Sequence, residues 1–139
     1  MKILSSALSK TDIFLFDKQN EAGGILGSSD GYIIDCVFCD NGKEHSKIKY
    51  VPDVSKLNSV LKRWVDSGIL FKGFFHSHLY GVEELSDEDV FYISKIAETV
   101  SASNFPLYFP LYVLPDRKFV VYEKTNKTSA LKKTEIFII

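Results

Sequence analysis

Two stretches with helical periodicity, separated by an apolar strand-like segment, constrain the fold of this chain more than any other feature. The first stretch carries apolar residues at helical spacing, namely Val54, Leu57, Val60, Leu61, Trp64 and Val65. Asp53 or Ser55 is suited to cap its start, and Gly68 is suited to end it. The second helix is expected to begin near Ser86, with an apolar stripe of Val90, Ile93, Ile96, Ala97 and Val100. Residues 69–76 between them predict a buried strand, interrupted by Gly73, against which both helices can pack.

The remaining segments predict further strands joined by turns. Strands are expected over residues 24–28, 32–39 and 48–51, with turns at 29–31 and 40–42. Residues 108–114 and 118–123 predict a hairpin around 115–117, and residues 136–139 an edge strand. Residues 4–18 fit either a helix capped by Ser5 or Ser6 or a short buried strand at 13–16. Because strands and helices are interspersed, the prediction is an α/β or α+β fold, with a sheet packed by two or three helices.

Length and charge narrow the class of protein. No repeat or linker divides the 139 residues, so we expect one domain over residues 1–139. Lys and Arg number 17 against 18 Asp and Glu, which argues against a nucleic-acid binder. No apolar run approaches the roughly 18 residues of a membrane span, and the N-terminus is not a convincing signal peptide. We therefore expect a cytoplasmic protein that binds neither nucleic acid nor membranes, while its oligomeric state is not predicted.

The cysteines and one histidine are not expected to do chemistry. Cys36 and Cys39 fall in one predicted strand with side chains on opposite faces, which is poor geometry for a disulfide. They could form half of a zinc site, but the sequence has no second Cys pair, so structural thiols are expected. His45 lies in a polar turn and is interpreted as a surface residue. The rings of Trp64, Phe71, Phe74 and Phe75 are assigned to the core.

The segment that points to chemistry is His76-Ser77-His78, followed by seven residues and then by Ser86 and Asp89. If the chain is extended through His78, both imidazoles lie on one face of the strand. If Ser86 begins a helix, Asp89 shares its face in the first turn, and the seven-residue loop can bring that turn over the histidines. Two imidazoles and one carboxylate suit Zn²⁺, and three protein ligands leave a fourth position open, as in catalytic zinc sites. The alternative is two half-exposed histidines beside a helix cap with an acidic first turn.

Two more residues complete a candidate hydrolytic site. Glu21 can act as the group that takes a proton from water and delivers it to a leaving amine, although it could equally be a solvated loop residue. Ser86 is placed to donate a hydrogen bond to the oxyanion that forms on a scissile carbonyl. Substrate-binding residues are not predicted from the sequence.

The sequence resembles the JAMM motif of the MPN/JAB (MPN+) zinc metallopeptidases. The resemblance is carried by Glu21 in E-A-G-G-I-L-G, the H-S-H of residues 76–78, Ser86 and Asp89. The resemblance extends from about residue 21 to residue 123 and is to the compact bacterial type. It implies a curved mixed β-sheet packed by two or three helices. It also implies that His76, His78 and Asp89 bind zinc, that Glu21 deprotonates the catalytic water, and that Ser86 stabilises the tetrahedral intermediate.

The same resemblance implies a substrate. The family cleaves isopeptide or peptide bonds after the C-terminal Gly of ubiquitin-like proteins, and bacterial members act in anti-phage conjugation operons or on sulfur carriers. We expect the substrate tail to add to an exposed sheet edge near the metal. Two features depart from the family: Leu79 replaces the usual Pro, and only 54 residues separate Glu21 from His76, which leaves little room for ubiquitin-clamping insertions.

Two other functions stay open at this point. Some proteins with this fold lack the ligands and act as non-catalytic scaffolds, but here all five motif residues are present. Others act in DNA repair or phage assembly, which the near-neutral charge disfavours.

Overall fold

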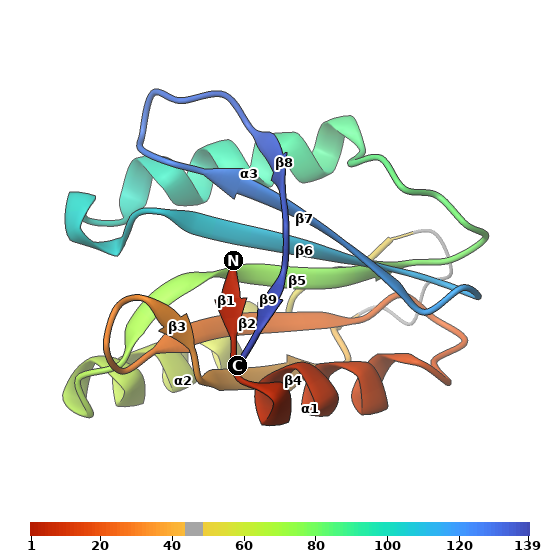
Figure 1. Ribbon diagram of the computed structural model, residues 1–139, viewed down its shortest axis with the longest axis horizontal. Coiled ribbons are helices and arrows are strands. Elements are labelled where there is room, and N and C mark those ends of the chain that lie inside the picture. Colours follow the sequence, from red (N-terminus) through yellow and green to blue (C-terminus); the bar gives the residue numbers. More distant parts are fainter. Residues whose placement is uncertain (44–48) are drawn as a thin grey trace.

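The computed structural model describes residues 1–43 and 49–139 (Figure 1). In chain order the elements are β1 (Lys2–Ile3), α1 (Ser5–Leu15), β2 (Gly23–Ser28), β3 (Ile33–Ile34), β4 (Cys36–Asp40), α2 (Val54–Asp66), β5 (Leu70–His78), α3 (Asp87–Thr99), the 3₁₀ helix η1 (Ala102–Asn104), β6 (Leu107–Val113), β7 (Lys118–Lys124), β8 (Lys132–Thr134) and β9 (Phe137–Ile138). The predicted class, a mixed sheet packed by helices, is confirmed.

The main sheet has six strands in the order β4-β2-β5-β6-β7-β8. Only β5 and β6 run parallel, and the other neighbours are antiparallel. The short strands β3, β1 and β9 form a separate parallel sheet that brings the two termini close together (Figure 1). Strand β5 is therefore central in the large sheet and has a partner on each side.

Three helices cover the two faces of the large sheet. On one face, buried residues of α1 and the small sheet pack with Leu26, Phe75 and Tyr112 in the largest core cluster. On the other face, Leu57 and Val60 of α2 cover Ile25, while Ile93 of α3 covers Leu107 and Phe109. Helices α2 and α3 thus share one face of the sheet (Figure 1), and Phe71 and Phe74 of β5 pack in the clusters of both helices.

A bulge in β5 decides which of its side chains face the two helices. Its pairing with β2 shifts between Leu26 and Gly27, so that Lys72 is an extra residue without a partner there. As a result Phe71 and Phe74, three residues apart, pack on the same clusters. Gly73 has φ +132°, and a Cβ there would lie 1.8 Å from the Tyr108 carbonyl oxygen, so only glycine fits.

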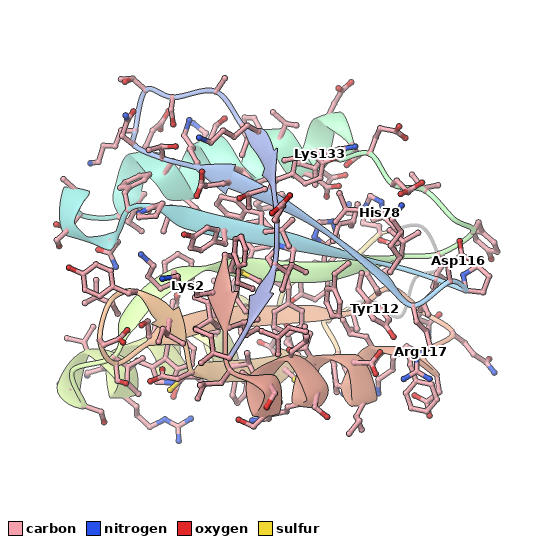
Figure 2. All side chains as sticks on the ribbon, in the orientation of Figure 1. Lys2, His78, Tyr112, Asp116, Arg117 and Lys133 are labelled. Atoms are coloured by element: carbon pink, nitrogen blue, oxygen red, sulfur yellow. The ribbon has the colours of Figure 1, made fainter. Side chains whose placement is uncertain are left out.

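Helix α1 resolves the ambiguity over residues 4–18 in favour of a helix. It is capped by Leu4 without a side-chain hydrogen bond, so the expected Ser5 or Ser6 cap is wrong. Asp12 attaches the helix to the β6–β7 hairpin by accepting hydrogen bonds from the Tyr112 hydroxyl and from Arg117, the latter at 2.5 Å. Figure 2 labels Tyr112 and Arg117 on the hairpin side of this contact.

Several local predictions need correction. The strand expected over residues 32–39 is broken at Asp35 into β3 and β4, which belong to different sheets. Residues 49–51 are not in a strand, and residue 48 lies outside the described residues. Val90 is 42% exposed, because the buried stripe of α3 contains Ile93 and Ala97. Strands β1 and β8 were not predicted.

Cys36 and Cys39 lie in β4 as free thiols. Across the described residues, no helix has the length and apolar character needed to cross a membrane.

Candidate metal centre

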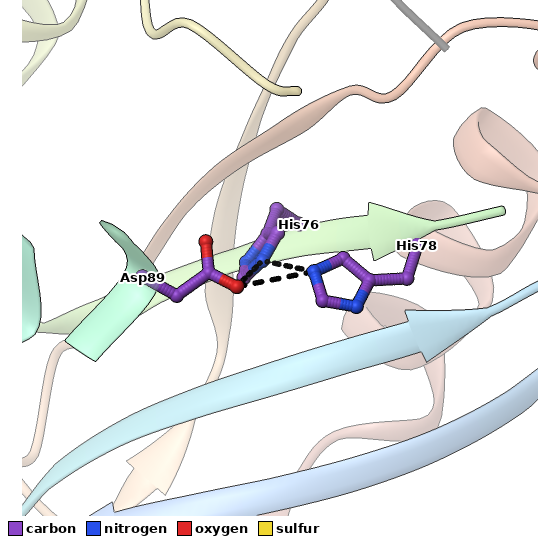
Figure 3. A group of neighbouring side chains, drawn as sticks. All are labelled: His76, His78 and Asp89. Atoms are coloured by element: carbon purple, nitrogen blue, oxygen red, sulfur yellow. Dashed lines mark hydrogen bonds and ion pairs between the residues drawn. The ribbon is translucent and has the colours of Figure 1, made fainter. Parts of the chain in front are cut away.

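His76, His78 and Asp89 come together at the end of β5 beneath the first turn of α3 (Figure 3). The two histidine Nε2 atoms lie 3.1 Å apart. The Asp89 Oδ2 atom is 3.2 Å from Nε2 of His76 and 3.1 Å from Nε2 of His78. Both histidines are buried, and β5 is extended through His78 as predicted. Within residues 1–43 and 49–139, this is the one group of His, Cys, Asp and Glu side chains with metal-site spacing.

The spacing of these three atoms fits a tetrahedral ion. With metal–ligand bonds of about 2.0–2.1 Å, the ligand atoms of a tetrahedral zinc site are separated by about 3.3 Å. The three distances measured here are 3.1, 3.1 and 3.2 Å. Two nitrogens and one oxygen therefore form one face of a tetrahedron, and its fourth corner belongs to no side chain of the group. The donor set and its spacing thus fit Zn²⁺.

A helix cap fixes the Asp89 carboxylate. Its Oδ2 atom accepts a 2.9 Å hydrogen bond from the backbone N–H of Ser86, while the Asp89 N–H donates to Ser86 Oγ at 3.0 Å. This capping box ties Asp89 to the start of α3. The sequence allowed Asp89 to be either a helix-capping residue or a metal ligand. The two roles are compatible, because the same Oδ2 atom accepts the capping hydrogen bond and lies beside both histidines. The Ser86 hydroxyl accepts in the cap, so its own proton stays available to a ligand.

The loop over residues 79–86 is held by several contacts although it lacks the usual Pro. Leu79 is buried in the largest core cluster, and the Gly81 N–H donates to the Leu114 carbonyl at 2.7 Å. The Tyr122 hydroxyl donates to the Glu83 carbonyl at 3.1 Å. The Val82 carbonyl lies 3.3 Å from Nδ1 of His78, which orients this imidazole so that Nε2 points at Asp89.

Ser77, between the two histidines, connects β5 to the segment that carries Glu21. Its backbone N–H donates to the Ala22 carbonyl at 2.8 Å, and its Oγ accepts from the Ala22 N–H at 3.0 Å. Glu21 is consequently held beside the metal-ligand strand and is only 6% exposed. The interpretation of Glu21 as a solvated loop residue is wrong.

The electrostatics of the group are strongly perturbed. Burial raises the pKa of Glu21 to about 7, an effect that the charge of His78 opposes and that of Asp89 reinforces. Burial also raises the pKa of Asp89, but hydrogen bonds with His76 and His78 outweigh it and hold the pKa well below the ordinary value. The site therefore contains an ionised carboxylate beside the histidines and a second carboxyl group that titrates near neutral pH.

An apolar groove leads away from the site. It has a volume of about 700 Å³, runs between α2 and α3, and has His76 and Asp89 in its lining. Trp64, Phe71 and Phe74 also line it, so these three rings are only partly buried and the prediction that they are core residues is incomplete. Phe75, on the opposite face of β5, is fully buried as predicted.

Tyr50, together with its partner Asp40, was missed in the sequence as a neighbour of the site. Tyr50 lies over the His76 imidazole with an interplanar angle of 17°, and its hydroxyl donates to Asp40 at 2.7 Å. The only signal was the turn expected at Asp40, which did not indicate a neighbour of His76. His45 lies outside the described residues.

Comparisons with known proteins bear on the fold. No protein-family model matches the chain, and no curated protein matches its sequence. Among solved structures, protein DSY2949 from Desulfitobacterium hafniense aligns with a TM-score of 0.69 and 18% identity, over 99% of this chain and 92% of that one. AF2198, a JAB1/MPN domain protein from Archaeoglobus fulgidus, aligns with a TM-score of 0.60 and 15% identity, over 100% and 99%. The chain therefore has a JAB1/MPN-like fold.

Proposed function

We propose that this protein is a zinc-dependent metallopeptidase of the JAMM type that hydrolyses the bond after the C-terminal glycine of a ubiquitin-like protein or its conjugates. The observation that carries the proposal is the convergence of three ligand atoms within 3.2 Å of one another, beside a buried carboxyl group whose pKa is about 7. A scaffold has no need for either arrangement, because an acid buried without an ion pair destabilises the fold.

The residues divide the chemistry among them. His76, His78 and Asp89 hold Zn²⁺, which as a Lewis acid polarises a carbonyl and makes water more acidic. Glu21 takes a proton from the attacking water and delivers it to the leaving amine, a role that suits a carboxyl group with a pKa near the working pH. The Ser86 hydroxyl donates a hydrogen bond to the carbonyl oxygen as negative charge develops on it.

The groove between α2 and α3 supports an extended tail as the substrate. Strand β5 is paired on both sides, by β2 and by β6, so the two histidines do not lie on a free sheet edge. The tail is therefore assigned to the apolar groove whose lining includes His76 and Asp89, rather than to a sheet edge beside the ligands as expected from the sequence. We expect the terminal glycine next to the two buried histidines, because it brings no side chain that has to be accommodated there. The proposed setting is a bacterial cytoplasmic system of ubiquitin-like conjugation, anti-phage defence or sulfur carriage.

The experiment pairs metal content with cleavage. Wild-type protein purified without chelator should contain about one zinc per chain by elemental mass spectrometry and should release a reporter fused after the Gly-Gly of a ubiquitin-like protein. His76→Ala and Asp89→Ala should lose both zinc and cleavage. Glu21→Gln should keep zinc and lose cleavage, because only proton transfer is removed, and Glu98→Gln on the exposed side of α3 is the matched control.

The same experiment can refute the proposal. A wild-type chain that takes up no zinc even after reconstitution would be a scaffold with the JAB1/MPN-like fold. Unchanged cleavage by Glu21→Gln would remove Glu21 from its role. Efficient cleavage of a substrate with Trp in place of its last glycine would exclude the narrow glycine subsite.

A further inference from the structure

Among the described residues, no hydrogen bond at Nδ1 orients the His76 imidazole. A metal-binding histidine usually donates its second ring N–H to an acceptor, which fixes the plane of the ring. His78 meets the Val82 carbonyl in this way, and Asp89 is fixed by its cap. Nδ1 of His76, in contrast, is buried and has no hydrogen-bond partner among the described residues. Among the contacts that the structure describes, the plane of this imidazole is therefore set by packing.

Two aromatic rings pack against His76. The Tyr50 ring is nearly parallel to the imidazole, with 6.5 Å between ring centroids and 17° between planes. Phe74 is tilted by 38° at 6.0 Å. Phe74 lies on the same strand two residues earlier, so it moves together with His76. Tyr50 comes from the segment before α2 and is the independent contact.

Tyr50 is itself fixed in place. Its hydroxyl donates to Asp40 Oδ2 at 2.7 Å, and the same oxygen accepts from the Asp53 N–H at 3.0 Å. Asp40 is 2% exposed, and its other oxygen accepts from the Gly42 N–H at 3.1 Å. The Tyr50 ring also packs on bare backbone of β2, since a Cβ on Gly23 would lie 2.7 Å from it. Burial raises the pKa of Tyr50 far above its usual range, and the Asp40 carboxylate adds to this, so the hydroxyl remains a donor.

We propose that Tyr50, anchored by Asp40, is a positioning residue that holds the plane of the His76 imidazole and so directs its Nε2 atom toward the metal. The inference rests on the proposed function, because it requires the three-ligand site to bind a metal. It assigns to stacking the task that a hydrogen bond performs for His78. Asp40 acts one step further away, by fixing the ring that fixes His76.

The test compares metal affinity and ligand geometry in matched variants. Tyr50→Leu removes the ring, Tyr50→Phe keeps the ring but loses the bond to Asp40, and Tyr108→Phe is the control. Tyr108 also lies beside a carboxylate, that of its cross-strand neighbour Glu123, but it is on β6 and is not among the aromatic contacts of the ligands. Zinc affinity is measured by competition with a chromophoric chelator, the geometry by the visible absorption of the Co²⁺-substituted protein, and stability by urea unfolding.

The expected result is graded. Tyr50→Leu should weaken zinc binding about 10- to 100-fold and alter the Co²⁺ spectrum, in line with losses of ligand-orienting groups in other metal sites. Tyr50→Phe should recover most of the affinity and a spectrum close to wild type. Tyr108→Phe should change neither, whatever it does to the urea midpoint.

The outcomes that overturn the inference are distinct from those that overturn the proposed function. Wild-type zinc affinity and an unchanged Co²⁺ spectrum in Tyr50→Leu would show that Tyr50 does not position His76, even if the variant is less stable. If Tyr50→Leu fails to fold, Tyr50→Phe still tests the inference, because it keeps the aromatic ring. A Tyr50→Phe variant that binds zinc no better than His76→Ala would show that the ring does not hold His76 in place. A wild-type protein that binds no metal would overturn both proposals, whereas one that binds zinc without cleaving would overturn the proposed function alone.

Discussion

Replacing the buried Glu21 by Gln should stabilise the metal-free protein at alkaline pH and leave its stability unchanged in acid. Glu21 is 6% exposed, and burial raises its pKa in the folded protein to about 7 from an ordinary 4.5. The folded state therefore retains the Glu21 proton at pH values where the unfolded chain has lost it. Below about pH 4.5 Glu21 is protonated in both the folded and the unfolded state, so it does not affect stability. Between about pH 4.5 and 7 the stability of the wild type falls as pH rises. Above about pH 7 Glu21 is ionised in both states, and the folded state bears the full cost of the buried charge.

The size of the penalty follows from the two pKa values. A tenfold change in a protonation constant corresponds to about 1.4 kcal/mol, so the ionised carboxylate lowers the free energy of unfolding by about 3 kcal/mol. Gln has nearly the same shape, carries no charge, and retains a side-chain oxygen that can accept a hydrogen bond. We therefore expect Glu21→Gln to be about 3 kcal/mol more stable than wild type at pH 8.

Urea unfolding in the presence of a chelator measures this difference. Wild type and Glu21→Gln are compared at pH 4.5, 6, 7 and 8, with Glu98→Gln as the exposed control, whose side chain is 70% exposed. The advantage of Glu21→Gln should be near zero at pH 4.5 and grow with pH, whereas Glu98→Gln should track wild type throughout. An advantage that is the same at pH 4.5 and pH 8 would refute the reasoning, since it could not come from the ionisation of Glu21.

Three further substitutions test how the fold places the site. Gly73→Ala should lower the free energy of unfolding by more than about 3 kcal/mol or prevent folding, because its Cβ would overlap a main-chain carbonyl. Gly31→Ala, whose Cβ meets nothing within 4 Å, should lower it by only about 1 kcal/mol. Thermal unfolding of the two variants measures this difference. Asp12→Ala should lower the urea midpoint by the equivalent of about 1–3 kcal/mol, because the buried Tyr112 hydroxyl loses its acceptor, and an unchanged midpoint would contradict the tie between α1 and β6. Ser86→Ala should cost about 1 kcal/mol as a lost helix cap, and an equally stable variant would show that the cap contributes nothing.

Local patterns in the sequence were sufficient to predict the elements that carry the metal ligands. Period-two alternation placed His76 and His78 on one face of a strand, because this alternation is a property of the extended backbone itself. Ser86 with Asp89 three residues later predicted a helix start, and the capping box is indeed formed between these two residues. The seven-residue loop limited how far Asp89 could lie from the histidines. These inferences needed no knowledge of distant contacts.

The tertiary structure decided what depends on residues far apart in the chain. The burial of Glu21, and with it a pKa near 7, results from its attachment to β5 through Ala22 and Ser77, a contact between residues 55 positions apart. The bulge at Lys72 puts Phe71 on the same side of β5 as Phe74, and the close approach of β6 leaves no room for a Cβ at Gly73; no local pattern reveals either feature. Tyr50 reaches His76 through a segment with no regular structure, where periodicity carries no signal. The spacing of the residues along the sequence predicts which of them can bind a metal. Packing between distant segments determines how the ligands are oriented, how far the site is shielded from water, and from which side a substrate can reach it.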